Sequence, residues 1–185
     1  MSQTSALNMM TFPLHGTRLI EASAGTGKTY TVAALYVRLV LGHGGEQGFH
    51  RPLMPPEILV MTFTEAATKE LRDRVRARLT ETARVLLGET QAHNDDFLMQ
   101  IHNAYAEPIA RAEAAQRLKT AAEWMDEAAI FTIHGFCYRL LRQHAFESGS
   151  LFDTEITPSA SDDEYQAACD YWRQFIVPFS REAAR

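Results

Sequence analysis

Residues 22–29, which read Ala-Ser-Ala-Gly-Thr-Gly-Lys-Thr, constrain the fold of this chain more than any other segment. A short apolar run at residues 18–21 precedes them and predicts a strand. Residues 30–40 follow and predict a helix with one apolar face, formed by Val32, Leu35, Tyr36, Leu39 and Val40. A strand, a glycine-rich loop, a Lys-Thr pair and a helix, in that order, form the context of a phosphate-binding P-loop. The loop departs from the strict pattern at one position, since Ala22 stands where a glycine is usual.

This loop predicts a site for the phosphates of a nucleotide. The backbone N–H groups of residues 25–29 are expected to surround a phosphate at the helix N-terminus. Lys28 is expected to reach the β- and γ-phosphates, and the Thr29 hydroxyl to ligate Mg²⁺, so these two are the candidate catalytic residues and Thr29 is the candidate metal ligand. The candidate cofactor-binding residues are Ala22, Ser23, Ala24, Gly25, Thr26, Gly27, Lys28, Thr29 and Tyr30. The alternative is a glycine-rich turn that begins an ordinary helix, which the agreement of strand, loop, Lys-Thr pair and helix disfavours.

Length and composition set wider limits. With 185 residues, 46% hydrophobic and 22% charged, the chain can form one globular domain and the start of a second. The net charge of −5 means that any contact with nucleic acid has to come from a local patch. Cys137 and Cys169 lie far apart and are expected to be buried or half-buried free thiols in a reducing compartment. Neither a membrane span nor a signal peptide is recognised, so the cytoplasm is expected.

Beyond the P-loop the chain alternates between strand and helix patterns. The predicted strands are 57–64, 128–133 and 152–156. The predicted helices are 65–87, ended by Gly88, then 136–146 and 158–175, with a helical region at 90–127 broken at Pro108. This alternation predicts an α/β domain with a mainly parallel sheet, whose ligand lies at the carboxyl ends of the strands. The loops after Ile20, Met61 and Ile133 are therefore expected to share one edge of the sheet, and 57–64 to be a strand buried on both faces.

Two further segments carry side chains suited to nucleic acid. Residues 62–67 read Thr-Phe-Thr-Glu-Ala-Ala, and an aromatic ring such as that of Phe63 can stack on a base while hydroxyls hold phosphates. A hydrophobic plug with a helix cap from Thr64 is the alternative. Residues 132–137 read Thr-Ile-His-Gly-Phe-Cys, where a lone histidine is more often structural than catalytic.

The predicted helix 65–87 is rich in positive charge. Its basic residues include Lys69, Arg72, Arg74, Arg76 and Arg78. They suit a nucleic-acid backbone, but the i,i+4 pairs Glu70–Arg74 and Lys69–Asp73 equally suit a self-paired, solvated helix face. The sequence leaves both interpretations open.

Taken together, the segments 22–29, 62–67 and 132–136 resemble, in order and spacing, the superfamily I helicases of the UvrD-like group. They are most similar to the beta subunits of bacterial exodeoxyribonuclease V. The resemblance covers most of residues 12–175 and is weak at 90–120. It implies a P-loop NTPase (RecA-like) fold, three-layer α/β/α with a parallel sheet, which binds ATP and Mg²⁺.

The resemblance also implies function and partners. The expected activity is that of an ATP-dependent DNA helicase and exodeoxyribonuclease subunit, acting on double-stranded DNA ends and single strands in double-strand break repair. The expected partners are DNA and the gamma and alpha subunits of exodeoxyribonuclease V, with no membrane. The candidate DNA-binding residues are Thr62, Phe63, Thr64, His134 and Phe136. A UvrD-like helicase without a nuclease, and a nucleotide- or DNA-binding adaptor without turnover, are the alternatives; a small-molecule kinase is disfavoured.

Asp126 and Glu127 resemble the Walker B acids that hold Mg²⁺ in P-loop enzymes. Such acids end a buried strand, whereas a helical pattern precedes this pair and the predicted strand follows it. We therefore interpret both as surface or helix-end residues. The chain is expected to be the amino-terminal part of a much larger protein, inactive alone. Residues 1–150 are expected to be an incomplete motor subdomain without Walker B, and 151–185 the start of an inserted helical subdomain.

Overall fold

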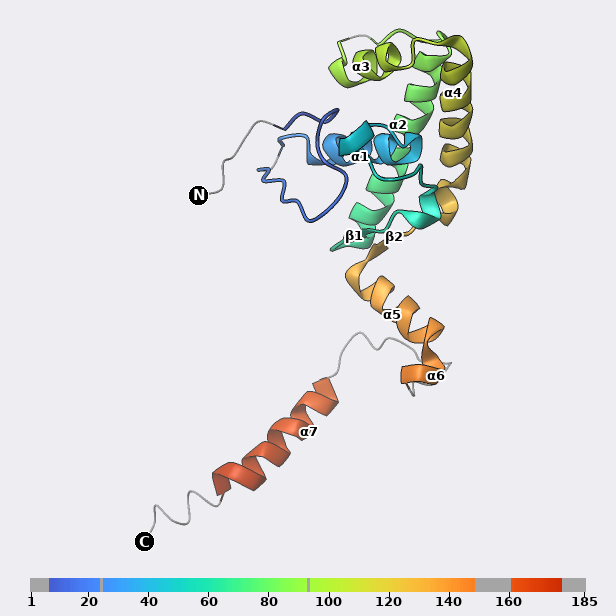
Figure 1. The fold of residues 1–185 in the computed structure, drawn as a ribbon. Helices are drawn as coiled ribbons and strands as arrows, with labels where there is room; N and C mark the ends of the chain where they lie inside the picture. The colour runs from blue at the N-terminus through green and yellow to red at the C-terminus, as the bar shows by residue number, and fades with distance from the viewer. Residues whose placement is uncertain (1–6, 24, 93, 149–160, 178–185) are drawn as a thin grey trace. The chain divides into compact units, whose positions relative to one another are not determined.

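The computed structural model describes residues 7–23, 25–92, 94–148 and 161–177 (Figure 1). The chain divides into two compact units, Met1–Cys137 and Tyr138–Arg185. The first unit holds α1 to α4 and both described strands. The P-loop and the second and third motifs all belong to this unit.

Helix α1 (Lys28–Leu41) begins directly after the P-loop, as predicted. It ends at Gly42, whose positive φ of 64° lets its N–H bond back to the carbonyls of Arg38 and Leu39. A Cβ at Gly42 would lie 2.9 Å from the Pro52 side chain, so glycine is required here for space as well as for conformation. The buried face of α1 is rotated from the expected one. Tyr36 and Val40 are buried as expected, while Val32, Leu35 and Leu39 are half-buried and Ala33, Ala34 and Val37 enter the core.

Three further helices complete the core of the first unit: α2 (Glu65–Leu86), α3 (Asp96–Ala104) and α4 (Pro108–Glu123). Helical spacing predicts an apolar stripe on α2 at Leu71, Val75, Leu79, Ala83 and Leu86. All of these are buried except Leu71, which is half-buried, and Gly88 follows the helix with a φ of 74°. The break at Pro108 is also confirmed, because proline occupies the first turn of α4, where its missing N–H costs no hydrogen bond. Helices α2 and α4 pack side by side (Figure 1).

The described sheet contains two short parallel strands, β1 (Val60–Thr62) and β2 (Ile130–Thr132), with Thr62 opposite Thr132. Both are shorter than predicted. Pro55–Glu57 forms a 3-10 turn before β1, and a second such turn, Trp124–Glu127, precedes β2. A third lies at Gly45–Gln47, in the connection after α1. The α/β character that the sequence predicts therefore appears, among the described residues, as this small parallel sheet in the first unit.

Two strand predictions are wrong in this structure. Residues 18–21 form no strand, and Leu19 is 82% exposed, because the described sheet consists of β1 and β2 alone and offers this segment no pairing. The loop after Ile20 therefore leaves no strand. The segment 57–64 is not buried on both faces either, since Leu59 and Met61 are about half exposed. The loops after β1 and β2 do leave the same edge of the sheet, as expected.

Helix α5 (Ile133–Gln143) starts three residues earlier than predicted and is followed by α6 (Ala145–Ser148). In the second unit, α7 (Ser161–Tyr171) continues into a π-helical turn, Trp172–Ile176. The predicted strand 152–156 lies outside the described residues. Both cysteines are free thiols; Cys169 is half-buried as expected, but Cys137 is exposed, contrary to the prediction. None of the described helices combines the length and the apolar character needed to cross a membrane.

Candidate nucleotide and nucleic-acid sites

The P-loop owes its shape to two glycines. Gly25 and Gly27 have φ values of +78° and +83°, in the left-handed region that side chains with a Cβ rarely adopt. No atom lies within 4 Å of a Cβ built on Gly25, so at this position conformation and not space requires glycine. Ala24 lies outside the described residues. The local sequence thus turns the chain sharply twice just before α1 begins.

Lys28 folds back onto the loop that precedes it. Its Nζ donates to the carbonyl oxygens of Ser23 at 2.5 Å and Ala22 at 3.2 Å. The Thr26 hydroxyl donates to the same Ser23 carbonyl at 2.7 Å. These groups line a cavity of about 420 Å³ together with the apolar side chains of Leu7, Ile20 and Val32. The lysine ammonium therefore lies near the N-terminus of α1, where it is hydrogen-bonded to neutral carbonyls and not to a carboxylate.

The start of α1 differs from the starts of the neighbouring helices. No side chain caps α1, and its first turn carries no acidic residue. By contrast, Thr64 caps α2, Asp95 caps α3 and Glu107 caps α4, each accepting a hydrogen bond from a first-turn N–H. The first-turn N–H groups of α1, which no side chain caps, and the positive end of the helix dipole favour binding of an anion. Thr29, the candidate metal ligand, is half-buried in this first turn.

Tyr30, the last candidate cofactor-binding residue, is hydrogen-bonded within a polar cluster. Its hydroxyl donates to Asp95 Oδ1 at 2.8 Å and accepts from Arg78 Nη2 at 2.9 Å. Arg78 and Asp95 form a two-point ion pair whose shortest contact is 2.6 Å. Burial raises the pKa of the Asp95 carboxyl, but the hydrogen bonds from Arg78, the Leu98 N–H and Tyr30 outweigh it, so that pKa lies below its ordinary value. Sequence analysis missed Asp95, although a string of Asn and Asp before an apolar run is a usual sign of a helix cap.

The second and third motifs meet at the carboxyl edge of the sheet. Thr64 caps α2 by accepting from the Ala67 N–H at 3.1 Å, which confirms the capping half of the alternative interpretation. The hydroxyls of Thr62 and Thr68 lie 2.5 Å apart. Thr132 donates to Glu65 and accepts from the Gly135 N–H, so a single hydroxyl ties the second motif to the third. The P-loop is connected to this edge through the packing of α1 on α2.

The candidate DNA-binding side chains differ in exposure. Phe63 is 89% exposed, which contradicts the plug interpretation for the described part of the chain. His134 is exposed on the first turn of α5, and Phe136 is half-buried, with its ring centroid 6.3 Å from that of Phe131. An exposed ring at the end of a strand is available for stacking.

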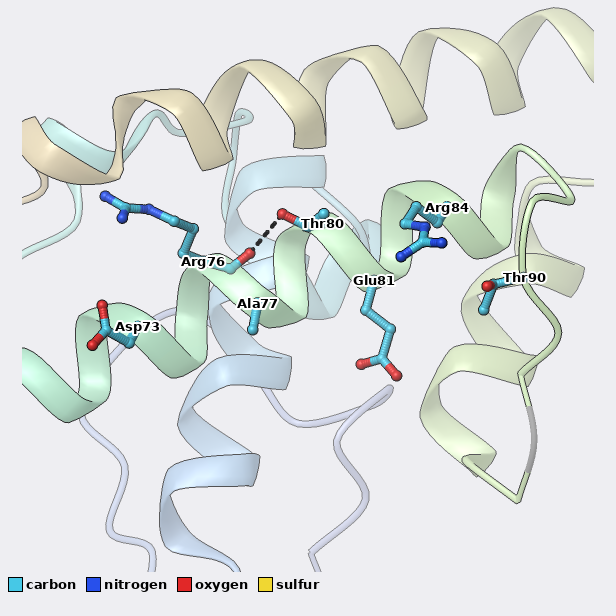
Figure 2. Close-up of a pocket in the computed structure, with 7 residues that line it drawn as sticks. All are labelled: Asp73, Arg76, Ala77, Thr80, Glu81, Arg84 and Thr90. Carbon is cyan, nitrogen blue, oxygen red and sulfur yellow. Dashed lines mark hydrogen bonds between the residues drawn. The ribbon is translucent and has the colours of Figure 1, made fainter.

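Most of the α2 arginines already have protein partners. Arg74 pairs with Glu70 at 2.8 Å, as the helical spacing predicts, and Arg72 donates to the Ile130 carbonyl at 3.3 Å. Arg78 is only 6% exposed, so it cannot lie on a nucleic-acid surface in this structure. Figure 2 shows the outer face of the same helix, where Arg76 and Arg84 stand two turns apart beside a depression of about 520 Å³. Acidic side chains of Asp73 and Glu81 share that depression and balance its charge.

The Asp126–Glu127 pair lies where the sequence analysis placed it. Both belong to the 3-10 turn that precedes β2, and the Asp126 side chain is 80% exposed and pairs with Arg76 at 2.5 Å. The surface interpretation is therefore confirmed. Within the described residues, no group of three or more His, Cys, Asp or Glu side chains is arranged to hold a metal ion.

Comparison with known proteins assigns this geometry to a class. The family model of the UvrD/REP helicase N-terminal domain matches residues 2–179, and the chain belongs to this family. Within it, the chain is 51% identical over 97% of its length to the RecBCD enzyme subunit RecB of Escherichia coli (strain K12), and covers 15% of that protein.

Other relatives carry the same name. The chain is 46% identical to RecBCD enzyme subunit RecB of Haemophilus influenzae over its whole length, again covering 15% of the relative. It is 32% identical over 90% of its length to the protein of that name from Mycobacterium tuberculosis, covering 14% of it. The chain thus spans about one seventh of the length of these curated relatives.

Proposed function

We propose that this chain is the ATP-binding, amino-terminal part of an ATP-dependent DNA helicase and exonuclease subunit of the RecB type. The whole subunit would unwind and degrade double-stranded DNA ends in recombinational double-strand break repair. Membership of the helicase family and the names of the relatives support this proposal. Those names make their bearers subunits of the RecBCD enzyme, so the gamma and alpha subunits of exodeoxyribonuclease V are the proposed partners.

One observation carries the nucleotide half of the proposal. Helix α1 starts with no capping side chain and no acid in its first turn, while α2, α3 and α4 each have a cap. Lys28 stands at that uncapped start, held only by backbone carbonyls. A positive helix end beside a lysine, within a loop shaped by two left-handed glycines, suits the phosphates of a nucleotide.

Different residues of the chain would bind the phosphates and the metal ion at this site. Backbone N–H groups of the loop and Lys28 would bind the phosphates of ATP, with Lys28 exchanging its carbonyl contacts for phosphate oxygens. Mg²⁺ in such sites is held by one or two side chains and the phosphates, and Thr29 would be one of those ligands. The bound ion would neutralise charge that develops on the transferred phosphoryl group.

The DNA half of the proposal rests on the edge that β1 and β2 share. Phe63 would stack on a base, and Thr62, Thr64, His134 and Phe136 would complete the contact with a single strand. Residues 1–150 would form the RecA-like motor subdomain, with a three-layer α/β/α fold built on a parallel sheet. Residues 151–185 would begin the inserted helical subdomain.

The test is Lys28→Ala in the full-length subunit, assembled with its partners. We expect DNA-stimulated ATPase activity and ATP-driven unwinding to be lost, because a charge-assisted contact to the transferring phosphoryl group disappears. Lys119→Ala is the matched control, since Lys119 lies on α4 beside Glu89, at 3.7 Å. A Lys28→Ala enzyme that keeps near-normal ATPase activity would overturn the assignment. ATP binding without turnover in the unmodified protein would instead favour the adaptor interpretation.

A further inference from the structure

Three helices of the first unit meet at one carboxylate oxygen. Asp95 Oδ1 accepts from the Tyr30 hydroxyl on α1 at 2.8 Å, from Arg78 Nη2 on α2 at 3.1 Å, and from the Leu98 N–H of α3 at 3.0 Å. Tyr30 and Arg78 are also bonded to each other, at 2.9 Å. The cluster of Tyr30, Arg78 and Asp95, which we call the α1–α2–α3 cluster, is therefore a closed ring of hydrogen bonds.

The ion pair of the cluster is sheltered from solvent, whereas Tyr30 is 40% exposed. The side chains of Arg78 and Asp95 are 7% and 17% exposed. The Arg78 guanidinium lies 4.7 Å from the ring centroid of Tyr30 and 5.1 Å from that of Phe97, so aromatic faces cover it on α1 and on α3. Charge-assisted bonds in such a place have defined geometry, and losing one partner leaves a buried polar group unpaired. A small movement of Tyr30 therefore has an energetic consequence at Asp95.

Tyr30 also belongs to the nucleotide site by its position in the chain. It follows Lys28 and Thr29 in the first turn of α1, where the backbone N–H groups have no capping side chain. When a phosphate occupies that turn, Lys28 has to leave the Ser23 carbonyl, and the first turn gains the acceptor that it lacks. The rigid backbone of a helical turn passes this ordering to Tyr30. The other end of the cluster is the cap of α3, since Asp95 supplies it.

We propose that Tyr30 is a positioning residue that couples occupancy of the P-loop to the stability of the α3 N-terminus, through Arg78 and Asp95. This inference rests on the nucleotide binding proposed above. Coupling of this kind is reciprocal: if a nucleotide strengthens the α3 cap, the intact cap strengthens nucleotide binding by the same factor. Neither end has to change shape, because ordering alone transmits the effect.

The test uses the full-length protein and a non-hydrolysable ATP analogue with Mg²⁺. Tyr30→Phe removes one hydroxyl and keeps the ring beneath Arg78. We expect it to weaken analogue binding about three- to tenfold, which corresponds to the net contribution of one ordinary hydrogen bond. Tyr36→Phe is the matched control, because it removes the same atom from the same helix, where the hydroxyl reaches only the Pro55 carbonyl at 3.4 Å. The control is expected to stay within about twofold of the unmodified protein.

A second measurement separates positioning from simple packing. We expect the analogue to slow hydrogen exchange of the Leu98 amide and its α3 neighbours about threefold or more in the unmodified protein, and to have no such effect in Tyr30→Phe. Asp95→Asn should likewise weaken analogue binding, while Asp96→Asn, which removes a carboxyl one residue further along α3, should not.

The outcomes distinguish the two proposals. Failure of the unmodified protein to bind the analogue would overturn the proposed function, and this inference with it. Normal binding by the unmodified protein, with Tyr30→Phe unchanged both in affinity and in the exchange response of α3, would overturn the coupling alone. If Asp95→Asn changes hydrogen exchange in α3 but not the affinity for the analogue, Asp95 serves only as a helix cap. That result would also overturn the coupling.

Discussion

Thr132, the last residue of β2, donates a hydrogen bond of 3.0 Å to Oε1 of Glu65, the first residue of α2, across a sequence separation of 67 residues. The same hydroxyl accepts from the Gly135 N–H at 3.1 Å. Thr132 is buried and Gly135 is half-buried, whereas Glu65 is exposed. This one side chain holds the second and third motifs in a common geometry.

Thr132→Val therefore should destabilise the first unit. The valine keeps the shape of the threonine but removes the hydrogen bonds to the exposed Glu65 carboxylate and from the half-buried Gly135 N–H, at a cost of about 0.5–1.5 kcal/mol. Urea unfolding of the 185-residue polypeptide measures this loss. The control is Thr80→Val, since the Thr80 hydroxyl is exposed and bonds only within its own helix, to the Arg76 carbonyl (Figure 2). Equal unfolding midpoints for the two variants would contradict the prediction.

Phe63→Ala in the full-length protein should weaken single-strand binding by about 1–3 kcal/mol, with little dependence on base sequence. Because the ring is 89% exposed, the thermal unfolding temperature should not change. Titration of a labelled oligonucleotide measures the affinity. Phe63→Leu, which keeps an apolar side chain but no ring, tests stacking itself and should behave like the alanine variant. Ile109→Ala removes another exposed apolar side chain, from α4, and serves as the control; Ile109 is 69% exposed. Unchanged affinity in both Phe63 variants would refute the stacking role.

Asp126→Asn and Glu127→Gln should leave the ATPase activity of the full-length protein within about threefold of normal, because both acids precede β2 and Asp126 is engaged by Arg76. Loss of a true Mg²⁺-holding carboxylate would cost far more. The 185-residue polypeptide alone should release no phosphate above background, since an arginine from outside the subdomain is worth about 10³–10⁵ in rate. Turnover that requires Lys28 and disappears in either acid variant would show that the pair is catalytic after all.

Asp95 should make the stability of the first unit depend on pH in acid. The folded pKa of its carboxyl lies below the ordinary value of 3.8, so its contribution is complete above that value and is lost as the pH falls through the folded pKa. The difference in unfolding free energy between the unmodified polypeptide and Asp95→Asn should therefore be largest near neutral pH and shrink below about pH 4. Urea titrations from about pH 7 to about pH 2.5 measure it. A difference that stays constant with pH would mean that the ionised form has no advantage.

Local features of this protein followed from its sequence. The start of α1 after Gly27, the Thr64 cap and apolar stripe of α2, and the break at Pro108 all depend on φ preferences, caps and side-chain spacing within a few residues. The surface position of Asp126 was equally local, because the helical pattern before it and the strand after it both lie within a short stretch. The motifs that relate the chain to helicases are of this kind too.

The tertiary structure alone decided which side chains were buried and which strands formed. Arg78 belongs to the same basic series as Arg74, yet Arg78 is buried against Asp95 while Arg74 stays in solvent with Glu70. Residues 18–21 have the composition of a strand, but a strand needs a neighbour to accept its backbone hydrogen bonds, and that neighbour is not encoded within the segment itself. Burial and strand pairing depend on residues far away in the chain. Spacing within a motif can therefore predict a helix or a strand, but not the segments against which it packs.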